Sequence, residues 1–196
     1  MANRPARTPA LEEEMSRTTL RTRTAIIDAA LEIWPAAPRA SLNDIAERAG
    51  VGRSTLHRHF IDRDDLRISL GRHVRDLAVA AIDRADPSFG PPPAALRRIV
   101  DGLLDVGPGL VWLHEHVDIR NYPELRAELI EGLDELDQLL ESARQPGDTS
   151  PPEWRSRIFW EVLRVGAKFV QDGATRQHAV EMILFTLTRG TFADDA

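Results

Sequence analysis

The sequence predicts an all-α fold, and three observations support this class. No segment alternates apolar and polar residues as a half-buried β-strand does. Apolar residues instead recur three and four positions apart, which is the spacing of one face of an α-helix. Prolines and glycines separate these stretches, most clearly at the three consecutive prolines of residues 91–93. A chain of 196 residues built in this way is long enough for one or two helical domains with a core.

The composition excludes several classes of protein. The chain has no cysteine, which rules out disulfides, thiolate nucleophiles and cysteine-based zinc sites. Residues 1–20 lack the apolar core of a secretory signal. The longest unbroken apolar run, residues 77–82, is far shorter than the roughly 20 residues that a membrane-spanning helix needs. We therefore expect a soluble, cytoplasmic protein.

Charge is distributed unevenly along the chain, whose overall net charge is −6. Residues 1–85 contain 14 arginines and 12 acidic residues, a net charge of +2. Residues 86–196 contain 11 basic and 19 acidic residues, a net charge of −8. A mildly basic N-terminal part on an acidic body is expected when only that part meets a nucleic acid.

The first elements are a flexible arm and a helix. Residues 1–17 have two prolines, scattered charge and no apolar period, so we expect a flexible N-terminal arm. A helix is predicted to begin at about Thr18 and to end before Pro35. Its apolar face is formed by Ile26, Ile27, Ala30, Leu31 and Trp34.

Residues 41–60, SLNDIAERAGVGRSTLHRHF, are predicted to form two short helices joined at one glycine. The apolar, core-facing side of the second helix is formed by Val51, Leu56 and Phe60. Ala46, Gly50 and Leu56 stand at the spacing of a helix-turn-helix. The alanine allows the helices to cross closely, the glycine can take the positive φ that the turn requires, and the leucine fills the angle between the helices. Ser41, with Asp44 three residues later, predicts a capped start for the first helix.

The second short helix carries a polar face that is suited to phosphates and base edges. This face is formed by Arg53, Ser54, Thr55, His57 and Arg58. An ordinary αα-hairpin in a helical protein would explain the apolar pattern alone. The turn spacing together with a basic, small-polar face favours DNA binding.

The remaining elements are also predicted to be helical. A long amphipathic helix covers about residues 63–85, and further helices follow at about 96–104 and 110–117. Pro123 is predicted to begin a leucine-rich helix that stops near Gln145. The last two helices cover about 153–171 and 175–189.

Residues from about 20 to 85 resemble the DNA-binding domain of the TetR (tetracycline-repressor-like) family of bacterial transcriptional regulators. The matching positions are Ala29-Ala30-Leu31, Ile45-Ala46-Glu47-Arg48-Ala49-Gly50-Val51, Thr55-Leu56, His59-Phe60 and Asp62-Arg63-Asp64-Asp65-Leu66. The rest of the chain resembles the family mainly in its length and in the number of helices.

The resemblance implies an all-α homodimer in which each chain has two functional parts. Residues 18–62 would be an N-terminal three-helix helix-turn-helix DNA-binding domain, and residues 87–196 a C-terminal helical ligand-binding and dimerisation domain. A connecting helix would cover residues 63–86. The family further implies a transcriptional regulator, most often a repressor, which a small and largely apolar molecule releases from a two-fold operator in double-stranded DNA.

The resemblance also assigns DNA contacts to both short helices and to the start of the next helix. The residues that would face base edges are Arg53, Ser54, Thr55 and Asn43. The residues that would contact phosphates are Ser41, His59 and Arg63. His57 departs from the family, where tyrosine is usual, and an imidazole reaches less far toward a phosphate. Residues 35–38, Pro-Ala-Ala-Pro, replace the usual glycine and aromatic residue before Ser41.

The C-terminal part carries candidates for a ligand pocket, for which core packing is the alternative role. Aromatic and apolar side chains with one polar group suit a small apolar ligand. The candidates are Leu104, Trp112, His116, Phe159, Trp160 and Phe169.

The last helix is apolar on four consecutive positions, residues 182–185. It is therefore expected either to run through the core or to bury a second face in a partner subunit. The candidates for a dimer interface are Val162, Leu184, Phe185 and Thr188.

No catalytic residue, cofactor or metal is expected. Gly50-Val51-Gly52 lacks the third glycine of a dinucleotide-binding fingerprint and follows a helix rather than a strand. The pairs His57/His59 and His114/His116 are two positions apart, so on a helix each pair points to different faces. The alternative to a DNA-binding regulator is an all-α homodimeric ligand-binding or interaction module without operator binding, and the unusual His57 is its best support.

Overall fold

The computed structural model describes residues 9–117, 121–128, 133–144 and 147–189, and the elements within these ranges are α-helices. The all-α prediction is confirmed. The chain divides into two compact units, residues 1–70 and 71–196, and the division falls within α4 (Arg63–Ala85). No helix in the described part of the chain is both long and apolar enough to cross a membrane.

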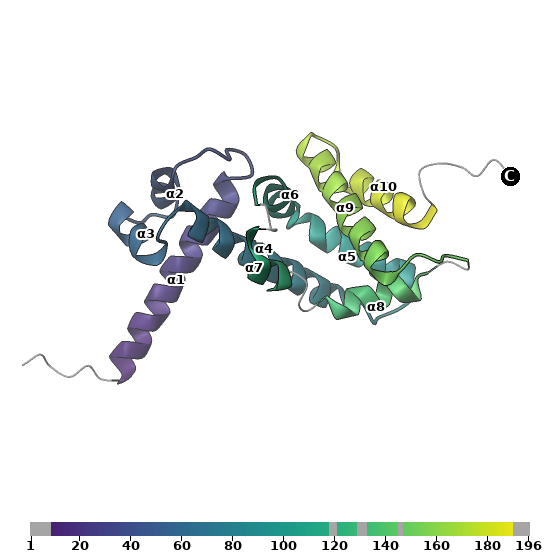
Figure 1. Cartoon of the computed structure of the whole chain (residues 1–196), viewed down its shortest axis with the longest axis horizontal. Helices are drawn as coiled ribbons and strands as arrows, with labels where there is room; N and C mark the ends of the chain where they lie inside the picture. Colours follow the sequence, from purple (N-terminus) through teal and green to yellow (C-terminus); the bar gives the residue numbers. More distant parts are fainter. Residues whose placement is uncertain (1–8, 118–120, 129–132, 145–146, 190–196) are drawn as a thin grey trace, which may run out of the picture. The chain divides into compact units, whose positions relative to one another are not determined.

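The N-terminal unit consists of a long first helix, two short helices and the start of α4. α1 (Pro9–Ile33) packs against α2 (Leu42–Arg48), which in turn packs against α3 (Arg53–His59) (Figure 1). The core contains the apolar faces that the sequence pattern predicts. Its buried members include Ile26, Ala30, Trp34, Ile45, Ala46, Leu56, Phe60, Leu66 and Leu70.

The turn between α2 and α3 has the geometry of a helix-turn-helix. Gly50 has a φ of +66°, a conformation that side chains with a Cβ rarely adopt. The backbone N–H of Val51 donates to the carbonyl of Ala46 at 2.9 Å and closes the turn. Ala46 and Leu56 are buried where the two helices meet. The predicted helix-turn-helix is confirmed.

Side-chain caps fix where α2 and α4 begin. Ser41 and Asp44 form a capping box at the start of α2, in which each side chain accepts a hydrogen bond from the other residue's backbone N–H. At the start of α4, the Asp62 carboxylate accepts from the backbone N–H of Asp65 at 2.9 Å. The Asp65 carboxylate accepts in return from the N–H of Ile61 at 3.0 Å.

In the C-terminal unit, α9 (Pro152–Gln171) has as many helical neighbours as any other described helix. It packs against α5 (Pro92–Leu104), α6 (Gly107–His116), α8 (Asp134–Ser142) and α10 (Arg176–Arg189). The remaining helix, α7 (Pro123–Glu128), is tied to α4 by Arg72, which donates to both carboxylate oxygens of Glu128 at 2.5 and 3.0 Å. Buried members of this core include Ile99, Leu103, Trp112, Leu136, Phe159, Leu163, Ala179 and Ile183.

Two glycines let α9 and its neighbours approach closely. A Cβ on Gly166 would lie 2.3 Å from the Cδ1 atom of Ile183 on α10. A Cβ on Gly107 of α6 would lie 2.8 Å from the Cβ of Ala167 on α9. Both distances are too short for carbon atoms in contact. The spacing of α9 against α6 and α10 therefore depends on these glycines.

The two largest differences between predicted and observed helix boundaries are at α1 and α8. α1 begins at Pro9 rather than at about Thr18, which suits a proline in the first turn and the acidic residues 12–14 near a helix N-terminus. The other residues of the predicted flexible arm, 1–8, lie outside the described residues. The helix predicted to begin at Pro123 is not a single helix up to Gln145, because a new helix, α8, begins with Leu133 as its N-cap. Gly132, a residue type that disfavours helix interiors, immediately precedes that N-cap.

Candidate nucleic-acid interface and ligand site

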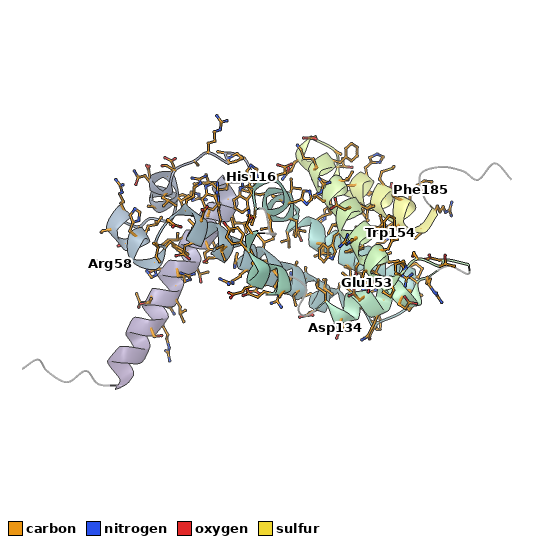
Figure 2. The ribbon with its side chains drawn as sticks, in the orientation of Figure 1. Arg58, His116, Asp134, Glu153, Trp154 and Phe185 are labelled. Atoms are coloured by element: carbon orange, nitrogen blue, oxygen red, sulfur yellow. The ribbon has the colours of Figure 1, made fainter. Side chains whose placement is uncertain are left out.

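The solvent side of α3 carries the polar residues that are predicted to meet DNA. Arg53, Ser54 and His57 are exposed and Thr55 is half-buried, whereas Leu56 on the inner side is buried. Arg58 is exposed on the same helix (Figure 2). The helix thus presents guanidinium, hydroxyl and imidazole donors over an apolar support. Such donors can bind phosphate oxygens and the acceptor edges of bases.

Arg23 of α1 holds the C-terminal end of α3 in place. Its guanidinium donates to the carbonyl of His59 at 2.9 Å and to the hydroxyl of the buried Ser69 at 2.7 Å. The Cζ atom also lies 4.4 Å from the centroid of the Phe60 ring, a cation–π contact. Three parts of the N-terminal unit therefore meet at one side chain, which restricts the orientation of α3.

The start of α2 presents two of the predicted DNA contacts, Ser41 and Asn43, and both are exposed. The backbone N–H and the hydroxyl of Ser41 donate to the Asp44 carboxylate at 2.7 and 2.9 Å. These hydrogen bonds, chiefly the one from the backbone, lower the pKa of Asp44. A phosphate placed here would compete with Asp44 for the Ser41 hydroxyl.

Two of the predicted phosphate contacts are less exposed than Ser41. His59 is half-buried, with its ring centroid 6.5 Å from that of Phe60. Arg63 is directed into the protein: its guanidinium donates to the carbonyls of Ala40 and Pro38 at 2.5 and 2.6 Å. Burial is the main cause that lowers the pKa of Arg63.

The six predicted ligand residues lie on three helices that pack together, α5, α6 and α9. Leu104, Trp112 and Phe159 are buried, and His116 and Trp160 are partly exposed. The Trp112 and His116 rings stack with their centroids 5.7 Å apart and an interplanar angle of 11°. The Phe159 and Trp160 rings meet edge to face at 5.4 Å. Apolar surface with an imidazole at its edge is suited to a small aromatic molecule.

Phe169 is the most exposed of the six ligand candidates. It is on the last part of α9 and 43% exposed, and its ring centroid lies 5.7 Å from that of His178 on α10. The Phe169 ring therefore lies on the surface of the α9–α10 pair.

An open groove between α5 and α10 is lined by residues that the sequence did not single out. They are Arg97, Arg98, Asp101, Arg176, Gln177 and Val180. Arg176 donates to the carboxylates of Asp105 and Asp101, and these hydrogen bonds raise the pKa of Arg176 above its usual value. No predicted ligand residue lines this groove.

The α9–α10 pair exposes apolar side chains that its own chain does not cover (Figure 2). Ile183 is 2% exposed, but Met182 and Phe185 on the same helix are 46% and 47% exposed. Of the two alternatives predicted for α10, the structure excludes the one in which this helix runs through the core of its own chain. Exposed apolar residues on the pair are Trp154, Ile158, Val165, Phe169, Met182 and Phe185. Among the other interface candidates, Val162 and Leu184 are half-buried and Thr188 is exposed.

The hydrogen bonds of Arg23 and Arg63 were not predicted from the sequence. Their partners lie 23 to 46 residues away along the chain. No local pattern links an arginine to a carbonyl at such a distance. Trp34 and Phe60, the buried aromatic residues that make cation–π contacts with these arginines, were predicted only as core residues.

Comparison with known proteins identifies close relatives. Residues 26–70 match the model of the tetR family of bacterial regulatory proteins. The HTH-type transcriptional repressor LfrR of Mycolicibacterium smegmatis is 44% identical over 170 residues, which cover 87% of this chain and 90% of the relative.

Solved structures of transcriptional regulators also superpose on this chain. The TetR-like regulator LfrR from Mycobacterium smegmatis in complex with proflavine superposes with a TM-score of 0.83 at 42% identity, over 90% of this chain and 99% of that one. The regulator FadR from Bacillus subtilis in complex with stearoyl-CoA has a TM-score of 0.65 at 18% identity, over 86% of this chain and 99% of that one. The second likeness shows the fold alone.

Proposed function

This chain belongs to the TetR family of bacterial transcriptional regulators, and from that premise we propose that it is a homodimeric repressor which a small, largely apolar molecule releases from its operator. The observation that carries the proposal is the exposed polar face of α3 on a helix-turn-helix whose turn depends on the positive φ of Gly50. The repressor LfrR, 44% identical to this chain, supports the sign of regulation.

The proposed DNA contacts come from α2, α3 and the residue before α2. Arg53, Ser54 and Thr55 at the start of α3 would read base edges in the major groove, with Asn43 beside them. Ser41, His57 and His59 would contact phosphates. Arg58 joins this set because it is exposed on the same helix.

The proposed dimer forms through α9 and α10. Their exposed apolar residues form a face on two adjacent helices, which is what a self-complementary interface needs. Two copies of α3 in one particle could then enter successive major grooves, whose centres are about 34 Å apart. A monomer would offer only one of these copies.

The proposed effector site lies among α5, α6 and α9, with Leu104, Trp112, His116, Phe159 and Trp160 as its contacts. The LfrR structure contains proflavine, which supports a planar aromatic molecule as the ligand class. A ligand lowers DNA affinity only if it binds better to the form that binds DNA poorly. We assign the connection between ligand and DNA to α4, because this helix belongs to both units.

DNA binding is tested by fluorescence anisotropy with a labelled fragment from the region flanking the gene of this protein. Unrelated DNA of equal length serves as competitor. We expect binding to the flanking DNA to be about a thousandfold tighter than to unrelated DNA, and to weaken steeply as salt is raised. Equal affinity for both fragments would contradict operator binding and favour a ligand-binding module instead.

Ligand binding is tested separately with proflavine and the protein without DNA, followed by the anisotropy of the dye. His116→Ala should weaken dye binding, because His116 stacks on Trp112. His114→Ala is the matched control, since His114 is exposed on the same helix. Dye binding that is equal in both variants would contradict the assigned site. The release of DNA from this protein by the dye is compared with release from an unrelated repressor–operator complex. Dye that acts by intercalating into the DNA would disrupt both complexes.

A further inference from the structure

The hydrogen bonds of Arg63 give it a role that differs from binding a phosphate. Its two terminal nitrogens donate to the carbonyls of Ala40 and Pro38, which lie 23 and 25 residues earlier in the chain. Its Cζ atom lies 4.8 Å from the centroid of the Trp34 ring, which is fully buried. One side chain at the start of α4 thus binds both the residue that follows α1 and the segment that leads into α2.

The segment held by Arg63 sets the position of Ser41. Ala40, whose carbonyl accepts from Arg63, is the residue immediately before Ser41. The same carbonyl also accepts from the indole N–H of Trp34 at 3.2 Å. Ser41 is the N-cap of α2 and is exposed. Movement at Ala40 would therefore displace both the Ser41 hydroxyl and the start of α2.

We propose that Arg63 is a positioning residue for DNA binding: together with Trp34 it holds the segment before α2, so that Ser41 and α2 are placed against the DNA backbone. Arg63 itself does not contact a phosphate. This inference rests on the proposed operator binding, and it concerns how the binding surface is held rather than whether DNA is bound.

Arginine is required for this role, and lysine cannot replace it. A planar guanidinium can donate from two nitrogens to two carbonyls while its face lies over an aromatic ring. A lysine ammonium is a single point of charge on a flexible chain and cannot satisfy the same three partners at once. For binding a phosphate the two residues differ much less, because lysine keeps the charge that a phosphate requires.

The substitution Arg63→Lys therefore separates the two roles. If Arg63 is a positioning residue, the affinity of the dimer for its operator should fall by about tenfold or more, the reduction expected when hydrogen bonds from a charged group are broken. The salt dependence should stay as in the wild-type protein, because Ser41 is uncharged and its displacement leaves the number of phosphates neutralised by cationic side chains unchanged. Arg84→Lys, at an exposed arginine near the end of α4, is the control and should change neither quantity.

A double-mutant cycle tests whether Arg63 acts through Ser41. Ser41→Ala and Arg63→Lys are measured singly and together, each below the thermal transition of that variant. We expect the double variant to bind about as weakly as the weaker single variant, because both changes remove the same interaction with DNA. A general loss of stability would not produce this coupling. Trp34→Phe removes the indole donor and keeps an aromatic ring, so it tests the same arrangement if Arg63→Lys does not fold.

Three results would overturn the inference while the wild-type protein still binds its operator. The first is wild-type affinity in Arg63→Lys. The second is a salt slope in Arg63→Ala that is smaller by about 0.9 for each phosphate that the variant no longer binds. The third is strict additivity of the Ser41 and Arg63 effects. Failure of the wild-type protein to prefer its operator would instead contradict the proposed function.

Discussion

Arginine has two distinct roles in the N-terminal unit. Arg53 and Arg58 are exposed on α3, whereas Arg23 and Arg63 are directed inward against Phe60 and Trp34. The first kind is available to bind DNA, and the second kind fixes the helices that carry the first. The two kinds are indistinguishable by residue type, so substitutions must be chosen from the partners of each side chain.

Replacing Arg53 with alanine is expected to relax the base preference of the protein. Arg53 lies at the exposed start of α3, where a guanidinium can bind a guanine edge in a bidentate manner. Discrimination should fall by about 1–3 kcal/mol at one position of each half-site and stay unchanged elsewhere. The measurement is the affinity for a panel of operators with single base-pair changes. Equal loss at every position would show that Arg53 contacts phosphate instead, and Arg84→Ala serves as the distant control.

The capping box at α2 is expected to make the stability of the protein depend on pH. The hydrogen bonds from Ser41 hold the folded-state pKa of Asp44 below its ordinary value of 3.8. The stabilisation is therefore fully present above that ordinary value and is lost as the pH falls through the lower, folded-state pKa.

Thermal unfolding of the wild-type protein and of Asp44→Asn, followed by circular dichroism from pH 7 to pH 3, measures this effect. We expect the wild-type protein to unfold at the higher temperature at pH 7, and the difference to shrink below pH 4. The other carboxyl groups are common to both proteins and cancel in the difference. A difference that does not change with pH would contradict the role of the ionised carboxylate.

Exposure on α3 and burial along each helix could be predicted from the sequence, because they follow from the helical period. Leu56 and Phe60 were predicted as core and are buried. The partners of Arg63 could not be predicted, since they depend on how the segment of residues 34–40 folds back toward α4. The exposure of Phe169 could not be predicted either. The spacing of apolar residues does not distinguish a ring that faces a ligand from a ring on an uncovered helix surface.

At the level of helices, the close packing of α9 against its neighbours depends on two glycines, which have no side chain to keep the helices apart. Gly166 and Gly107 allow an approach that a Cβ would prevent. The neighbouring side chain at Gly166 is that of Ile183, which is β-branched, buried and therefore unable to turn away at low cost.

The variant Gly166→Ala is expected to destabilise the C-terminal unit by about 1–3 kcal/mol, because overlap with Ile183 outweighs the better helix propensity of alanine. Gly102→Ala is the matched control on α5: the nearest atom to its Cβ would be the carbonyl oxygen of Ala81 at 3.6 Å, an ordinary van der Waals distance. That variant should be neutral or more stable by about 0.5–1 kcal/mol. Chemical denaturation measures both. A stable Gly166→Ala variant would show that the α9–α10 spacing is not set by this glycine.

Helix identity was predictable wherever apolar residues repeat over several turns, as in α4, α5 and α9. Boundaries were less predictable at both ends of such patterns. Residues 9–17 have no apolar period but still form helix, because proline and acidic residues favour a helix N-terminus. α8 starts separately after Leu133, which makes no side-chain capping hydrogen bond, within a leucine pattern that would suit one continuous helix.

At the level of the whole molecule, the uncovered face of α9 and α10 is expected to hold two chains together. Phe185→Glu should convert the dimer to a monomer, because a charge buried in an apolar interface is costly. Phe89→Glu is the control: Phe89 is even more exposed but lies in the turn before α5. Sedimentation velocity distinguishes the two states. A dimer that survives Phe185→Glu but not Phe89→Glu would place the interface elsewhere.

Loss of the dimer should also abolish tight operator binding, since each chain alone offers one α3 to the DNA. The amino-acid pattern indicated a second buried face for α10 but not which surface would cover it. The covering surface depends on how two chains pair, and the spacing of apolar residues along one helix does not reveal it.

Operator binding by a dimer is tested most directly by the stoichiometry of the complex with the DNA that flanks the gene of this protein, measured by analytical ultracentrifugation. We expect two chains, or a multiple of two, on one two-fold site, with a complex that dissociates as salt is raised. A single chain on the DNA, or no complex that survives competition from unrelated DNA, would contradict this expectation.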